Sequence, residues 1–427
     1  MKAYVDMSRE ELLSLKASLE EEFKTEEAKG RSFNMARGKP GASQLAISMP
    51  MLDVINGNSD MNTLLGNDTR NYGDWDGIGE CRQLLADMME VKKANVIVCG
   101  NSSLNIMYDT VMRSMVMGVN GLTPWCKLEQ VKFLCPVPGY DRHFKITELF
   151  GIEMIPIPMG EDGPDMDLVE QYVNQDASVK GIWCVPKYSN PTGITYSDEV
   201  VRRFANLKPK AEDFRIFWDN AYCIHHIFED IQDKILNILE ECEKAGNPNM
   251  VYVFASTSKV SFPGSGVSAI ATSLENMEYI KKFMTTQIIG HDKINQLRHV
   301  RFFKNIDGLN AHMKKHAALL RPKFEAVLHI LEKELTGLGI GSWTKPRGGY
   351  FISFDAMPGC AKLIVAKCKE LGLVLTGAGA TYPYEKDPKD SNIRIAPSFP
   401  TPEEMIEATK MFVLCVKLAS VEKLLNK

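Results

Sequence analysis

The amino-acid sequence predicts an α/β protein with a large domain, built on a largely parallel sheet, and a smaller α+β domain. From about residue 95, short apolar runs alternate with stretches of helical periodicity, and this alternation stops in the last third of the chain. The length of 427 residues is too great for one small core. Together these observations favour two unequal domains over a single compact one.

Five apolar runs have the character of buried strands, and each ends in small or polar residues: NVIVCG, IWCVP, RIFWD, MVYVFA and SAIATS. Between them lie helical stretches such as SLNIMYDTVMRSMVMG, where Leu104, Tyr108, Val111 and Met115 are spaced to share one face. Strand–helix alternation over this length indicates a mostly parallel sheet. The carboxyl ends of such strands form the ligand site.

Both termini predict helices. Ser8 with Glu11 has the pattern of a capping box for a first helix, and Thr401 with Glu404 has the same pattern before a long final helix. GGYFISFDA and SNIRIAPSF predict strands of the smaller domain. We expect the N-terminal helix to pack on this same domain.

Composition excludes several classes of function. The formal net charge is −4, so no basic field favours nucleic acid or an anionic membrane as a partner. The N-terminus is acidic and amphipathic rather than a signal peptide, and no apolar run approaches the roughly 20 residues of a membrane span. The ten cysteines include no CxxC pair, so we expect no metal site and reduced thiols in the cytoplasm.

Five short motifs fall at or beside predicted strand ends. They are GNSS with Asn101, Ser102 and Ser103, NPTG with Asn190, WDNAY with Asp219 and Tyr222, STSK with Ser256, Ser258 and Lys259, and SNIRIAP with Arg394. GNSS opens a helix, where free N–H groups and the positive end of the dipole bind anions. An amine for a Schiff base, a carboxylate for a pyridinium nitrogen and an anion cradle are what pyridoxal phosphate requires.

The remaining side chains suit the same cofactor. Asn190 and Tyr222 can hydrogen-bond the phenolate oxygen of its ring. Lys259, once displaced by substrate, can carry the proton from Cα to C4′. Arg394 offers a fork for a substrate carboxylate that a lysine cannot match in geometry.

In this order, with PGY (138–140) between GNSS and NPTG, the motifs resemble those of the class I aminotransferases of pyridoxal phosphate fold type I. The resemblance runs from RGKP (37–40) to Arg394 and includes NYGDWDG (71–77). The segments ARGKP, SNPTGITYS and GHDKINQLRH are most similar to those of a divergent aspartate aminotransferase subgroup.

The resemblance implies a large cofactor-binding domain over residues 61–315, with a mostly parallel seven-stranded sheet flanked by helices. Residues 1–60 and 316–427 would together form the smaller α+β domain. The protein would be a homodimer with shared active sites.

The resemblance also assigns roles. Lys259 would bind the cofactor, Asp219 would pair with the pyridine nitrogen, Tyr222 and Asn190 with the phenolate oxygen, and Tyr140 would stack on the ring. The cofactor's other contacts, mainly to the phosphate, would come from Asn101, Ser102, Ser103, Ser256, Ser258 and, across the dimer interface, Tyr72.

Substrate binding is implied in the same way. Gly38 and Asn190 would help Arg394 bind the α-carboxylate. Arg37 and Lys39, with Arg142 behind them, are the candidates for a second, side-chain carboxylate.

One position departs from the family pattern. Most members have an arginine eight residues after the lysine, where it neutralises the phosphate, and Val267 stands there in this sequence. We expect another cation to replace it, with Lys293 and Arg301, from this or the partner subunit, as candidates. The alternative is that both line a solvated helix face.

Three functions remain to be weighed. The leading one is transamination between an amino acid, aspartate or glutamate, and a 2-oxo acid such as 2-oxoglutarate. A β-lyase or decarboxylase could use the same cofactor, because the reaction depends on which Cα bond lies perpendicular to the ring. A regulator that senses the cofactor is disfavoured, since RGKP begins at residue 37 and leaves no room before it for a DNA-binding domain.

Overall fold

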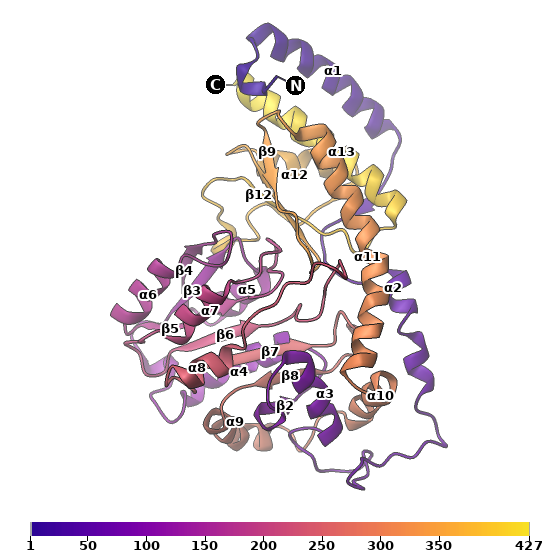
Figure 1. Ribbon diagram of the computed structural model, residues 1–427. Coiled ribbons are helices and arrows are strands. Elements are labelled where there is room, and N and C mark those ends of the chain that lie inside the picture. Colours follow the sequence, from indigo (N-terminus) through magenta and orange to yellow (C-terminus); the bar gives the residue numbers. More distant parts are fainter. Residues whose placement is uncertain (1, 427) are drawn as a thin grey trace.

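The computed structural model describes residues 2–426, and its centre is a seven-stranded sheet with the order β2-β8-β7-β6-β5-β3-β4 (Figure 1). The strands are β2 (Val96–Val98), β3 (Lys132–Val137), β4 (Glu153–Pro158), β5 (Val179–Cys184), β6 (Arg215–Asp219), β7 (Val251–Ser256) and β8 (Ser268–Ala271). All neighbours are parallel except the two pairs that β8 forms, with β7 and β2. The expected mostly parallel α/β architecture is confirmed.

Successive side chains of each central strand enter opposite layers. Leu134, Ile182 and Trp218 belong to one hydrophobic cluster, whereas their chain neighbours Phe133, Trp183 and Phe217 belong to another. This is the period of two that a pleated strand imposes, and both faces are apolar because helices cover both. The helices of this part are α3 (Gly79–Met89), α4 (Ser103–Met117), α5 (Asp141–Leu149), α6 (Met166–Gln175), α7 (Asp198–Ala205), α8 (Ile238–Lys244), α9 (Leu274–Gln287) and α10 (Lys293–Phe303).

A second part, at the top of Figure 1, is built from both ends of the chain. Its strands form an antiparallel sheet, β12 (Asn392–Ile395), β10 (Ile352–Ala356) and β9 (Gly341–Trp343), and a parallel pair, β1 (Phe33–Asn34) and β11 (Leu373–Val374). Its helices are α1 (Arg9–Ala28), α12 (Ala361–Glu370) and α13 (Pro402–Leu425). Helix α1 packs on α13, as expected.

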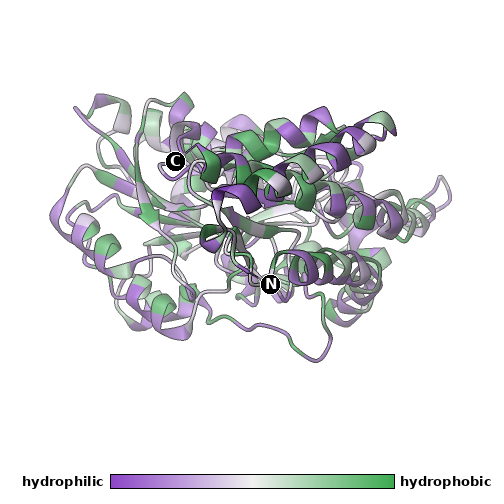
Figure 2. Cartoon of the chain, turned by 90° about the horizontal axis from the view of Figure 1, so that it is seen from above, coloured by the Kyte–Doolittle hydropathy of each residue, from purple (hydrophilic) through white to green (hydrophobic). Residues whose placement is uncertain are grey.

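The capping boxes predicted at Ser8 and Thr401 are both present, because each hydroxyl accepts from the backbone N–H three residues on and each glutamate bonds back. Short elements complete the chain: α2 (Ala42–Ala46) and the 3₁₀ turns Tyr4–Asp6, Met49–Asp53, Lys93–Asn95, Trp125–Lys127 and Pro383–Glu385. Figure 2 shows how hydrophobic and hydrophilic residues alternate along the helices, as expected where one face of a helix packs inward.

Helix α11 (Ile306–Leu335) links the two parts and runs between them along the side of the molecule (Figure 1). It packs on α10 and α3 near its start and on α13 further along. The predicted boundary at residue 315 falls inside this helix, and the division into residues 1–60, 61–315 and 316–427 stays a prediction. Among residues 2–426, no helix is both long and apolar enough to cross a membrane.

Candidate active site

The motif residues gather at one edge of the large sheet, where the parallel strands end. Asp219 is the last residue of β6, and Ser256 is the last residue of β7. Asn101 follows β2 closely, and Tyr140 precedes α5 directly after β3. Polar residues therefore stand at the ends of β6 and β7 or follow β2 and β3 within a few residues, which is how the sequence positions the site.

Asp219 is buried and its two carboxylate oxygens differ. Oδ2 accepts a hydrogen bond from Nε2 of His143, 2.9 Å away, whereas Oδ1 has no partner within residues 2–426. The His143 ring stacks on Trp183 with centroids 4.5 Å apart and meets the Tyr140 ring edge-on at 4.9 Å. The ring therefore holds the carboxylate in place and leaves one oxygen for a ligand.

Lys259 lies in the turn after β7, and its Nζ is 4.8 Å from the centre of the Tyr222 ring. Burial lowers the pKa of Lys259, and the charge of Asp219 opposes this shift. An amine with a lowered pKa is more often neutral and therefore nucleophilic. The Tyr350 hydroxyl lies 3.5 Å from the carbonyl oxygen of Lys259.

The anion-binding end is formed by the start of α4 and the turn after β7. Ser102 is the N-cap of α4, but its hydroxyl makes no capping bond, so it is free for a ligand. Ser256 Oγ donates to Ser258 Oγ at 3.0 Å, and Ser258 Oγ donates to the carbonyl oxygen of Asn101 at 3.2 Å. The structure thus brings together GNSS and STSK, which are far apart in the sequence.

Arg394 reaches the same site from β12, and it is buried. Its Nη1 donates to Asp141 Oδ1 at 2.8 Å and to Asn190 Oδ1 at 3.2 Å, while Nη2 donates to Thr376 Oγ1 at 3.2 Å. Its guanidinium carbon lies 4.9 Å from the centre of the Phe351 ring.

Gly38 leaves room for the Phe351 ring beside Arg394. A Cβ at this position would lie 2.4 Å from Cζ of Phe351, so only a glycine allows the ring to lie where it does.

Other predicted residues lie at the margin. Arg37 and Lys39 are exposed, and Lys39 Nζ lies 3.9 Å from the centre of the Phe399 ring. Ser103 begins α4, and Arg142 is exposed on α5. Tyr72 is 82% exposed in the loop before α3.

The two proposed replacements for the missing arginine bind elsewhere in this subunit. Lys293 Nζ donates to the carbonyl oxygen of Gly73 at 2.9 Å and lies 3.8 Å from Asp74. Arg301 donates to the carbonyl oxygen of Asp60.

Sequence reasoning missed several residues that contact the predicted ones, namely His143, Asp141, Tyr350, Phe351 and Thr376, and it missed Trp183, which stacks on His143. His143 had a signal, because it lies three residues after Tyr140 at the start of a helix and so returns to the same face. Asp141 had none, since its partner Arg394 is 253 residues away.

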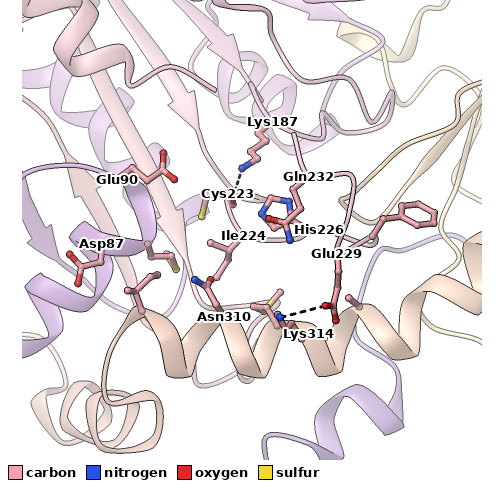
Figure 3. A pocket seen from close by; sticks show the side chains of 15 residues that line it. Asp87, Glu90, Lys187, Cys223, Ile224, His226, Glu229, Gln232, Asn310 and Lys314 are labelled. Atoms are coloured by element: carbon pink, nitrogen blue, oxygen red, sulfur yellow. Dashed lines mark hydrogen bonds and ion pairs between the residues drawn. The ribbon is translucent and has the colours of Figure 1, made fainter. Parts of the chain in front are cut away.

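A separate cavity of about 430 Å³ lies between α3, α11 and the segment after Tyr222 (Figure 3). Both lysines that line it are engaged: Lys187 Nζ donates to the Cys223 carbonyl oxygen at 2.8 Å, and Lys314 pairs with Glu229. None of the predicted cofactor or substrate residues lines it. Within residues 2–426, no group of three histidine, cysteine or acidic side chains is arranged to hold a metal ion.

The residues at the sheet edge fit pyridoxal phosphate. The free Oδ1 of Asp219 is a buried acceptor for a protonated ring nitrogen, and Lys259 supplies an amine with a lowered pKa. The start of α4 supplies backbone donors for a phosphate.

Comparisons with known proteins give a consistent result. The family model described as aspartate amino-transferase matches residues 7–427. An aspartate aminotransferase of Corynebacterium glutamicum is 44% identical over 422 residues, which cover 99% of this chain and 97% of that protein. The crystal structure of an aspartate transaminase from C. glutamicum superposes with a TM-score of 0.96 at 43% identity, over 99% of both chains.

A more distant structure shares the fold. An α-aminoadipate aminotransferase from Thermus thermophilus, solved in complex with N-(5′-phosphopyridoxyl)-L-leucine, superposes with a TM-score of 0.73 at 18% identity, over 92% of this chain and 93% of that one.

Proposed function

The chain belongs to the aspartate aminotransferase family and is an aminotransferase, and from this premise we propose that it uses pyridoxal phosphate to transfer the amino group of aspartate or glutamate to a 2-oxo acid such as 2-oxoglutarate. The observation that carries the proposal is that a buried carboxylate, Asp219, and a lysine of lowered pKa, Lys259, both lie at the carboxyl ends of neighbouring strands, β6 and β7. Arg394 adds a carboxylate-binding group to the same edge.

The cofactor supplies an electron sink for the electron pair of the substrate Cα–H bond. Asp219 Oδ1 holds the proton on the ring nitrogen, and His143 keeps the carboxylate oriented through Oδ2. Tyr222 and Asn190 would donate to the phenolate oxygen of the bound cofactor, and Tyr140 would cover one face of its ring.

Lys259 moves the proton. With the cofactor bound, its Nζ would accept the proton of the substrate Cα and would return it to C4′. The lowered pKa of Lys259 supports this role, because it favours the neutral amine, which is the form that accepts a proton.

Arg394 binds the α-carboxylate of the substrate through its fork of donors. The second carboxylate of aspartate or glutamate needs a further cation. Arg37, Lys39 and Arg142 are all exposed, but Nζ of Lys39 already lies over the Phe399 ring, so we assign the second carboxylate to Arg37 and Arg142. Replacing them with glutamine is expected to raise KM for aspartate and not for alanine.

A homodimer in the cytoplasm is part of the same proposal. Leu64, Leu65 and Tyr72 are 88%, 84% and 82% exposed, and they lie in one loop before α3. Large apolar side chains gathered on such a segment support contact with a second copy of the chain. Tyr72 would then reach the phosphate in the neighbouring subunit.

Trapping the cofactor on its lysine tests the proposal. Borohydride reduction of the purified enzyme, followed by proteolysis and mass spectrometry, is expected to find a phosphopyridoxyl group on Lys259. Lys187, the buried lysine after β5, gives the matched control: Lys187→Ala should keep the label, and Lys259→Ala should lose it. A label on any other lysine would contradict the proposal.

A further inference from the structure

The phosphate cradle formed by α4 and the turn after β7 has neutral residues, namely Asn101, Ser102, Ser256 and Ser258. Val267, which follows this turn, is buried and apolar. A phosphate dianion held by neutral donors alone binds more weakly than one that also meets a cation. The candidates for such a cation lie on helix α10.

Helix α10 carries three cations, and they point to different places. Lys293 and Arg301 donate to the carbonyl oxygens of Gly73 and Asp60, in the segment that precedes α3. Arg298 instead reaches the loop after Lys259, where its Nη2 donates to the Ser265 hydroxyl and to the side-chain oxygen of Asn295.

The loop that Arg298 contacts touches the phosphate cradle. The Pro263 carbonyl oxygen lies 3.5 Å from Asn101 Nδ2, and a Cβ placed on Gly266 would lie 3.3 Å from the Asn101 carbonyl oxygen. Asn295, one turn before Arg298 on α10, fixes this loop by donating to the Gly266 carbonyl oxygen at 2.9 Å. The loop of residues 263–266 thus contacts both Arg298 and Asn101 of the cradle.

The guanidinium of Arg298 is incompletely satisfied. Its Nε is buried and has no hydrogen-bond partner within residues 2–426, and the partners of its Nη2 are neutral oxygens. A buried donor without a partner costs free energy that an anion would recover. Both the position and the unpaired donor favour an anionic ligand.

From these contacts we propose that Arg298 is the cation that binds the phosphate of the cofactor. This inference rests on the proposed use of pyridoxal phosphate. Arg298 contributes its charge at the loop of residues 263–266, beside the donors of α4, while Lys293 and Arg301 hold the segment that carries Tyr72.

A comparison of two ligands tests the role of Arg298, because pyridoxal lacks the phosphate of pyridoxal phosphate. Dissociation constants of both are measured by absorbance on the cofactor-free full-length enzyme. Arg298→Gln is expected to raise the dissociation constant of pyridoxal phosphate about 10- to 100-fold. The dissociation constant of pyridoxal is expected to change less than about twofold. Arg298→Lys, which keeps the charge, is expected to retain most of the preference.

Lys293→Gln and Arg301→Gln are the matched controls on the same helix. If Arg298→Gln weakens both ligands equally or neither, the inference is wrong. If Lys293→Gln alone loses the preference for the phosphorylated ligand, the partner's lysine carries the charge instead. If the wild-type enzyme forms no lysine-bound complex with either ligand, the proposed function itself fails.

A second measurement needs no variant and so does not depend on the folding of Arg298→Gln. Phenylglyoxal labels accessible arginines of the cofactor-free enzyme, and mass spectrometry locates the label. Inorganic phosphate is expected to protect Arg298 and to leave the labelling of Arg301 unchanged. Equal labelling of Arg298 with and without phosphate would overturn the inference.

Discussion

Nε2 of His143 lies 2.9 Å from Oδ2 of Asp219, and both side chains are buried at the carboxyl end of β6. The histidine is fixed in turn by its stacking on Trp183. The carboxylate can therefore present Oδ1 in one orientation without losing its hydrogen bond. The hydrogen bond between His143 and Asp219 therefore orients the carboxylate that would contact the cofactor.

Removing the charge of Asp219 tests its role. Asp219→Asn keeps the shape of the side chain but cannot stabilise a protonated ring nitrogen, so we expect kcat to fall about 10²- to 10³-fold. His143→Gln removes one hydrogen bond to the carboxylate, and we expect a loss of about 10-fold. Single-turnover kinetics with aspartate measure both effects.

Asp213 gives the matched control. It is buried just before β6 begins, where it pairs with Lys180 at 2.6 Å, so Asp213→Asn should lower stability and leave kcat per folded molecule near the wild-type value. A His143→Gln enzyme that is as impaired as Asp219→Asn would show that the histidine does more than position the carboxylate.

Arg394 and Asp141 affect substrate binding in opposite directions. Arg394→Lys loses the fork that binds a carboxylate, and we expect kcat/KM for aspartate to fall about 100-fold. Asp141 accepts from Arg394 at 2.8 Å and partly neutralises it, so Asp141→Asn should bind a dicarboxylate inhibitor about threefold more tightly. Inhibition constants for maleate test this, and weaker binding would mean that Asp141 mainly orients the arginine.

Gly38 is predicted to act on the substrate through Phe351. In Gly38→Ala the new Cβ would displace the Phe351 ring, which lies beneath Arg394, so KM for aspartate should rise about 10-fold while the cofactor stays bound. A Cβ on Gly57 meets no atom within 4 Å, so Gly57→Ala is the matched control. Equal KM values for the two variants would contradict this explanation.

Acid should destabilise the protein through His316. Its Nε2 donates to the Val260 carbonyl oxygen at 3.0 Å and its Nδ1 accepts from Gln44 at 3.1 Å, a pattern that requires the neutral ring. Burial and the neighbouring His312 lower the pKa of His316 from 6.5 to about 4. Between these values the unfolded chain binds more protons than the folded one, so stability falls as the pH drops from 6.5 towards 4.

The effect on stability can be measured directly. The shift implies that His316 contributes about 2 kcal/mol to the loss of unfolding free energy between pH 7 and pH 5. Urea unfolding of His316→Gln should show a correspondingly smaller loss, although this variant is less stable at pH 7. His329, exposed on the same helix, gives the control His329→Gln. An unchanged pH dependence in His316→Gln would rule out this role.

The carboxyl ends of the parallel strands could be predicted from the sequence, because there a polar residue follows an apolar run directly. Strands β3 and β4 were missed, since Pro136, Pro156 and Pro158 weaken the strand pattern. Helix α4 was predicted correctly, and Val111 of the expected face is buried, but Tyr108 of that face is exposed, whereas Ile106 and Met107 outside it are buried. The packing of α4 on β7 and β8 decides this, and periodicity alone does not describe that packing.

Long-range contacts explain the other omissions. Arg298 belongs to the same stretch as Lys293 and Arg301, and only the folded chain shows that Arg298 alone turns to the loop after Lys259. Likewise, the pairing of Arg394 with Asp141 joins the last strand to a helix of the large sheet. Local patterns predict such residues as charged surface groups.

The central claim is tested most directly by an absorption spectrum of the purified protein before and after addition of L-aspartate without a 2-oxo acid. We expect the visible band of lysine-bound cofactor to give way to the band of the pyridoxamine form, and to return when 2-oxoglutarate is added. Pyruvate and ammonia from a β-substituted amino acid would instead indicate a lyase. A visible band that aspartate and glutamate both leave unchanged would contradict transamination of an acidic amino acid.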